Sequence, residues 1–288
     1  MASLVLDAPA PAPARARRTS RRAPVVRTAV LTIAAVYFIG PLAAAFWFSV
    51  NNRRDTFSLG VYGRMFTAAG FVTAFTLSLE LALITVVVTL LLLVPTMLTV
   101  HLRYPRMRSA VEVLCLFPLV IPAVVLVVGV RGVVGWGPDQ LAGTPFAAVI
   151  NGVQEGGLPW ILPLEYVVLA LPFTFRAIDA GLRSSSVTTL VEASRNLGSS
   201  WVTAVWRVVL PTLRTSLLNA AFLAFALVLG EFTIASILQY QTFAVWILQF
   251  NNTDGQLSVA VSLISLLITW VLLLAIAALG RDRRTKDS

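Results

Sequence analysis

With 288 residues, 58% of them hydrophobic, only 12% charged and a net charge of +9, the chain is not an ordinary water-soluble protein, because soluble domains carry about 25% charged residues. Long apolar runs over most of its length indicate one multi-pass membrane domain. The single cysteine and the single histidine exclude an internal disulfide and multi-histidine metal sites, and the sequence contains no Walker A phosphate-binding loop.

The first 27 residues consist mainly of Ala, Pro and Arg. This composition cannot bury an apolar core, so it predicts a disordered basic tail over 1–27. The arginines serve as a topology signal or touch anionic lipid. A second short tail is expected over 281–288, which leaves 28–280 as the membrane domain.

Six apolar stretches are long enough to cross a bilayer, which takes about 20 residues. The fourth contains three prolines and Glu165, which neighbouring helices would have to accommodate. The six predicted spans are Thr28–Val50, Thr73–Val100, Ala110–Val130, Pro159–Ile178, Thr212–Leu238 and Leu257–Leu279.

The distribution of basic residues predicts the orientation. With the N-terminus in the cytoplasm, 18 of the 22 Lys and Arg residues flank the spans on the inner side. The four on the outer side are Arg53, Arg54, Arg64 and Arg131. Both termini are therefore expected in the cytoplasm.

The segment 187–211, between the fourth and fifth spans, is predicted to form a cytoplasmic elbow. Thr189 followed three residues later by Glu192 suggests a capping box that starts a short helix, and Gly198 is placed to end it. Pro211 suits the first turn of the fifth span. Between Gly198 and Pro211 lies an amphipathic stretch, and its apolar face consists of Trp201, Val202, Val205, Trp206 and Val209.

The elbow resembles the Glu-Ala-Ala motif of bacterial ABC importer membrane subunits. That motif reads Glu-Ala-Ala, three residues, Gly, nine residues, Ile, one residue, Leu-Pro. This chain has Glu192-Ala193-Ser194, Gly198, Val208 and Leu210-Pro211 at every matching position. Ser194 replaces Ala, and Val208 replaces Ile. Residues 160–240 resemble the polyamine, phosphonate and ferric-iron group more than the sugar group.

The resemblance implies an all-α, type I importer permease with six spans in the bacterial inner membrane and no catalysis of its own. The elbow would be a coupling helix, spanning Thr189 to Gly198, in a groove of a cytoplasmic ATPase. Ala193 and Ser194 would then pack closely, Glu192 would cap the helix and meet a basic residue, and Leu210-Pro211 would fix the entry to the next span.

The resemblance also implies partners. ATP and Mg²⁺ would bind two copies of the ATPase, while this chain itself holds no cofactor or metal. A second permease subunit, expected to be a different but related chain, would complete the path. An extracytoplasmic binding protein would deliver the substrate, and lipid would surround the spans; no nucleic acid is expected.

Three glutamates lie inside predicted spans: Glu80, Glu165 and Glu231. Charges within a membrane are costly and indicate a function by default. Their sequence positions place all three about 10 Å below the outer surface at 1.5 Å per residue. Such an acidic ring would suit a polyamine or a similar organic cation. Alternatively, one glutamate pairs with Arg131 and another caps a helix near Gly230 or Pro163.

Other functions remain open from sequence alone. The same type of subunit could import phosphonate, ferric iron or a sugar. A secondary transporter driven by an ion gradient is a further alternative, although no inverted repeat is visible. An intramembrane enzyme is disfavoured because no nucleophile–base pair or metal cluster stands out.

Overall fold

The chain is helical throughout the part that the computed structural model describes, which comprises residues 22–51, 58–140, 142–145, 152 and 158–281. No β-strand occurs in these ranges. The long helices are α1 (Arg22–Val50), α3 (Phe71–Leu102), α5 (Ala123–Gln140), α7 (Ile161–Ser184), α10 (Leu210–Leu229) and α13 (Gly255–Arg281). The shorter ones are α2 (Gly60–Arg64), α4 (Arg108–Leu116), α8 (Val187–Asn196), α9 (Trp201–Ala204), α11 (Thr233–Ile237) and α12 (Phe243–Asn251).

Four helical segments of the described residues are long and apolar enough to cross a membrane, or five if a bent pair is one span. They correspond to the first, second, fourth and fifth predicted spans, at Arg27–Val50, Phe71–Leu102, Ile161–Ser184 and Trp201–Ile237. The described apolar part of α13, Gly255–Val271, is shorter. The total of six spans and the cytoplasmic termini stay predictions.

The third predicted span, Ala110–Val130, is not one continuous helix. The segment Pro105–Leu119 meets Ala123–Trp136 at an angle of 95°. Pro118 and Pro122 flank the bend, and proline removes a backbone donor and clashes with the preceding turn of a helix. In the fourth span, Pro163 falls in the first turn and Pro172 is accommodated inside a continuous α7.

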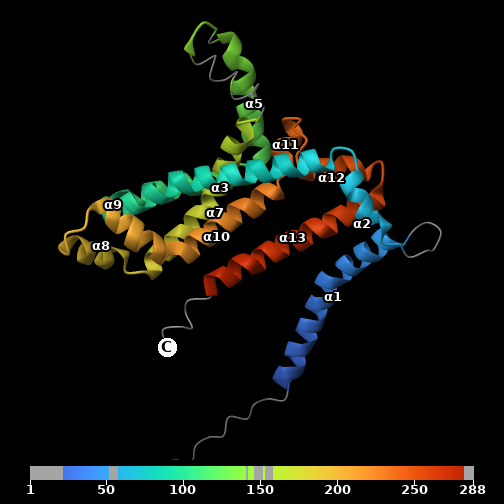
Figure 1. Ribbon diagram of the computed structural model, residues 1–288, viewed down its shortest axis with the longest axis horizontal. Helices are drawn as coiled ribbons and strands as arrows, with labels where there is room; N and C mark the ends of the chain where they lie inside the picture. The colour runs from blue at the N-terminus through green and yellow to red at the C-terminus, as the bar shows by residue number, and fades with distance from the viewer. Residues whose placement is uncertain (1–21, 52–57, 141, 146–151, 153–157, 282–288) are drawn as a thin grey trace, which may run out of the picture.

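Three helices, α3, α7 and α10, pack together at the centre of the molecule (Figure 1). Gly181 of α7 lies so close to α10 that a Cβ atom there would come within 2.5 Å of the Cβ of Ser216. Arg108 of α4 donates a 2.6 Å hydrogen bond to Asp179 of α7, which also pairs with Arg183 at 2.7 Å. These contacts fix the end of α7 from which the elbow departs.

Helix α1 lies apart from this centre and approaches α13 near one end (Figure 1). Its apolar side chains are mostly exposed, among them Tyr37, Phe38 and Trp47. An all-apolar exposed helix needs lipid or another protein around it. Residues 1–21 and 282–288, which hold most of both predicted tails, lie outside the described residues, and α1 begins at Arg22.

Candidate functional site: the elbow and the buried carboxylates

The elbow helix α8 starts two residues earlier than the sequence suggested. It begins at Val187, with Ser186 at the N-cap position and no side-chain capping bond. The predicted Thr189–Glu192 capping box is therefore wrong, because both residues already lie inside the helix. The reason is tertiary packing: Val187 and Val191 are buried in the core cluster that also contains Phe175 and Leu213, and this burial draws the first turn into the helix.

The end of α8 is a Schellman turn. The N–H of Ser199 donates to the carbonyl of Ser194 at 3.2 Å, and the N–H of Gly198 donates to the carbonyl of Arg195 at 2.9 Å. Gly198 has a φ of +88°, in the left-handed region that glycine adopts without a steric cost. Gly198 thus sits at the position that ends the helix, as its place in the sequence indicated.

The tip of the elbow is exposed. Glu192 and Ala193 face away from the core, and Glu192 has no hydrogen bond or ion pair among the described residues. Leu197 is 89% exposed, which is unusual for a large apolar residue on a structured turn. Sequence reasoning missed Leu197, although it directly precedes the turn glycine. Ser194, in contrast, is half-buried, and its hydroxyl bonds to the hydroxyl of Ser199 across the turn.

The second half of the elbow changes its helical register. The Ser200 hydroxyl caps α9 by accepting the N–H of Thr203 at 3.2 Å. A π-helix then runs from Val205 to Val209 before α10 begins. Single π turns of this kind occur often at functional sites. Pro211 lies in the first turn of α10, where its missing N–H costs nothing.

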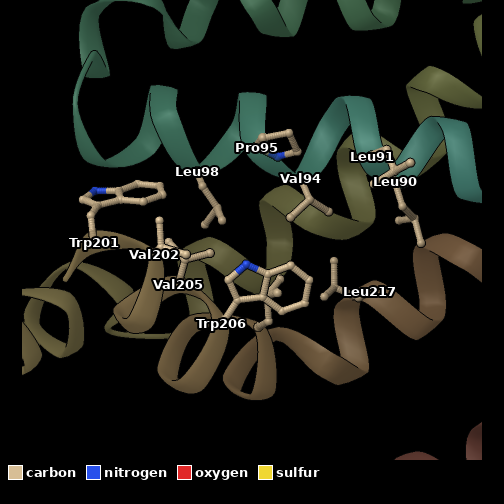
Figure 2. A pocket seen from close by; sticks show the side chains of 11 residues that line it. Leu90, Leu91, Val94, Pro95, Leu98, Trp201, Val202, Val205, Trp206 and Leu217 are labelled. Carbon is tan, nitrogen blue, oxygen red and sulfur yellow. The ribbon is translucent and has the colours of Figure 1, made fainter. Parts of the chain in front are cut away.

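The predicted apolar face of this half divides between two environments. Four of its five residues line an apolar cavity of about 430 Å³ between α9–α10 and α3. Figure 2 shows the indole rings of Trp201 and Trp206 on either side of Val202 and Val205, opposite Leu98 and Pro95. Val209 is instead fully buried in the core.

The three intramembrane glutamates have three different environments. Glu80 is exposed on α3. Glu231 precedes α11, where its Oε1 accepts the N–H of Ile234 at 2.8 Å and its Oε2 accepts that of Ala235 at 3.3 Å. Glu165 is 3% exposed, and neither of its oxygens has a hydrogen-bond partner among the described residues. Glu231 is thus the helix cap of the alternative interpretation, formed after Gly230.

Arg131 does not pair with a glutamate in the described residues. Its guanidinium donates to the carbonyl of Ile237, at the end of α11, at 3.4 Å. The three ion pairs found among the described residues all lie elsewhere. Glu165 and Glu231 are both buried, whereas Glu80 is exposed.

A helical bundle with several candidate membrane spans and an exposed elbow between two of them is the architecture expected of a membrane transport subunit. Residues 102–285 match the family described as the binding-protein-dependent transport system inner membrane component. The chain belongs to this family. It is therefore a non-enzymatic permease subunit of an ABC importer in the inner membrane, and the family implies ATPase and substrate-binding partners.

Three relatives carry the same name, molybdenum transport system permease protein ModB. The proteins from Mycobacterium bovis and Mycobacterium tuberculosis are each 29% identical over 221 residues, which is 74% of this chain and 82% of the relative. The protein from Azotobacter vinelandii is 29% identical over 164 residues, which is 56% of this chain and 70% of the relative. These names give no support to the polyamine group that the sequence resemblance suggested.

Proposed function

We propose that this chain forms half of the path of an importer that takes up molybdenum as an oxyanion. Two ATPase subunits carrying ATP and Mg²⁺ would drive it, a second permease subunit would complete the path, and an external binding protein would deliver the substrate. The observation that carries the coupling part is the exposed tip of α8, with Leu197 at 89% exposure beside an unpaired Glu192.

The structure of the elbow supports a role as a rigid lever. Val187 and Val191 anchor α8 to the core, and the Schellman turn at Gly198 fixes its other end. A short helix held at both ends moves as one body when a partner pushes its tip. Leu197 and Ala193 would pack into a groove of the ATPase, and Glu192 would meet a basic residue there.

The elbow would lie in the cytoplasm. This placement rests on the excess of arginine on the same side of the membrane, including Arg183, Arg195 and Arg207 around the elbow itself. The opposite end of the bundle, where α11 and α5 meet, would then face the binding protein.

The substrate proposal rests on the names of the three relatives and on the state of the carboxylates. Molybdenum in neutral, aerated water is a tetrahedral dianion, which needs hydrogen-bond donors and cations around it. Glu231 already accepts two backbone N–H groups, so it is less available to a substrate ammonium group. Glu80 is exposed on α3, whereas Glu165 and Glu231 are buried, and three carboxylates in such different environments argue against one acidic ring.

One observation favours an organic cation as the second candidate. Glu165 is buried with both oxygens unpartnered, and a buried polar group without a partner is costly. A substrate ammonium group would satisfy it. If Glu165 serves this purpose, Glu165→Gln should weaken uptake of the cation and leave uptake of an anion unchanged.

The test uses the full complex of both permease subunits and the ATPase in proteoliposomes, with the cognate binding protein outside. We expect ATP-dependent accumulation of radiolabelled molybdate and none of spermidine. Spermidine accumulation without molybdate accumulation would reject the oxyanion proposal. Molybdate uptake that persists without ATP, but follows an imposed ion gradient, would instead indicate a secondary transporter.

Two variants test the lever in the same vesicles. Glu192→Arg should abolish uptake while the complex of membrane subunits remains intact, because the charge on the exposed tip is reversed. Glu112→Arg is the matched control, because it makes the same charge reversal on α4, outside the elbow residues 187–211. Normal transport by the Glu192→Arg complex would reject the lever role.

A further inference from the structure

A polar cavity lies at the end of the bundle opposite the elbow, between α5 and the turn that follows α11. It has a volume of about 270 Å³ and is lined by Arg131 of α5 and by Gln239 and Tyr240 of the turn. Figure 1 shows α11 beside the base of α5. No carboxylate lies among the lining residues, so the cavity carries positive charge.

The turn that forms one wall of this cavity has an unusual residue at its tightest point. The N–H of Tyr240 donates to the carbonyl of Ala235 at 2.9 Å, and the N–H of Gln239 donates to that of Ser236 at 3.2 Å. These are the two bonds of a Schellman turn, which normally places glycine where this chain has Gln239. Gln239 has a φ of +65° and is the one non-glycine residue with a positive φ in the described part of the chain.

A glutamine in this conformation opposes the local backbone preference. Strained backbone of this kind collects at ligand sites, where the side chain has a purpose that outweighs the strain. Gln239 lines the cavity, and its carboxamide has no hydrogen bond to another described residue. It therefore offers two N–H donors to the cavity.

Arg131 lines the same cavity. Its one hydrogen bond among the described residues is the 3.4 Å contact with the carbonyl of Ile237, and a guanidinium has five N–H donors. The hydroxyl of Tyr240 also has no partner among the described residues. A planar guanidinium with adjacent neutral donors matches the geometry of a tetrahedral oxyanion.

We propose that Arg131, Gln239 and Tyr240 form an oxyanion-binding site at the outer mouth of the path, where the substrate first meets the permease. This site rests on the proposed import of an oxyanion. The cavity is large enough for a small dianion with part of its hydration shell, since a water molecule occupies about 30 Å³. The site recognises the anion before the path opens, on elements distinct from the elbow.

The competing role for Arg131 is structural. The contact with Ile237 satisfies a carbonyl that the end of α11 leaves free, and a cap needs no ligand. A purely structural Arg131 and Gln239 would affect stability and leave anion affinity unchanged. A binding role would affect the affinity even when stability is preserved or improved.

The experiment measures binding of radiolabelled molybdate to the intact permease–ATPase complex in nanodiscs. We expect saturable binding that tungstate displaces, and a loss of affinity of about tenfold or more in Arg131→Gln, because a charge-assisted contact is removed. Gln239→Gly should also weaken binding while the complex melts at an unchanged or higher temperature, because glycine relieves the strained φ. Arg64→Gln is the matched control. It also removes a cation of the predicted outer side, but Arg64 pairs with Asp254.

Phosphate of an anionic lipid shares the chemistry of the ligand, so the nanodiscs are prepared with and without phosphatidylglycerol. Molybdate affinity that does not depend on phosphatidylglycerol assigns the site to the substrate. Retention of phosphatidylglycerol that depends on Arg131, without saturable molybdate binding, would overturn the proposal. So would equal molybdate affinity in the wild type, Arg131→Gln and Gln239→Gly.

Uptake measurements separate this site from the proposed function. If wild-type vesicles accumulate molybdate and Arg131→Gln vesicles do so with the same half-saturating concentration of loaded binding protein, the outer site is rejected and the import of oxyanion stands. If the wild type accumulates no molybdate, the proposed function itself fails.

Discussion

Two turns of the same backbone geometry lie in opposite regions of this permease. Helix α8 ends in a Schellman turn with Gly198 at the left-handed position, and α11 ends in one with Gln239 there. At the turn of α8, called the inner turn after its predicted side of the membrane, the residue suits the backbone, and the exposed side chain of Leu197 lies beside it. At the turn of α11, called the outer turn after its predicted side of the membrane, the residue opposes the backbone, and Gln239 is one of the residues that line a cavity. The difference indicates that the first turn is kept for its shape and the second for its side chain.

The largest effect is expected at the inner turn. Gly198→Pro should abolish ATP-driven uptake, because proline fixes φ near −65° where the turn has +88°, and because it removes the N–H that bonds Arg195. Uptake into proteoliposomes measures the loss. Substantial residual transport would show that the shape of the turn is not needed for coupling.

A smaller effect is expected from exchanging residues between the two turns. Gly198→Gln should destabilise the permease by about 1 kcal/mol or more, the usual cost of a left-handed residue with a side chain. Gln239→Gly should have the opposite sign, a gain of about 0.5 kcal/mol after the greater chain entropy of glycine is deducted. Thermal unfolding of the purified complex measures both. If both substitutions changed the stability in the same direction, the contrast between the two turns would be lost.

The smallest effect on uptake is expected at Ser199. Its hydroxyl donates to the carbonyl of Ser194 and bonds to the Ser194 hydroxyl, so Ser199→Ala should loosen the inner turn by about 1 kcal/mol. Uptake should fall only modestly, because the backbone bonds of the turn remain. A complete loss of uptake at normal stability would show that Ser199 itself contacts the ATPase.

The sequence was informative where a local pattern coincides with a backbone requirement. The Glu-Ala-Ala spacing and Gly198 identified the elbow, and long apolar runs identified most of the membrane helices. The start of α8 was missed because burial of Val187 and Val191 is a tertiary effect that overrides a capping pattern. The 95° bend was missed because an apolar run that contains two prolines is equally compatible with a single, kinked membrane span.

The outer cavity could not be found from the sequence. Gln239 carries no turn signal, since glutamine rarely takes a positive φ, and Arg131 lies more than a hundred residues away from it along the chain. From the sequence, Glu231 was a candidate substrate contact because its charge lies inside a predicted span. In the structure, its carboxylate caps α11. An intramembrane carboxylate therefore indicates a local requirement as readily as a substrate contact, and only the hydrogen bonds distinguish the two.

The central claim, that the tip of α8 transmits the work of the ATPase, is tested most directly by cross-linking at Leu197. Cys115 is the only cysteine, so Leu197→Cys in a Cys115→Ala background gives a single reactive thiol on the exposed tip. During ATP turnover in the intact complex, we expect a short thiol-reactive cross-linker to join this residue to the ATPase subunit in high yield. Cross-links absent from the ATPase, with transport intact, would contradict the claim.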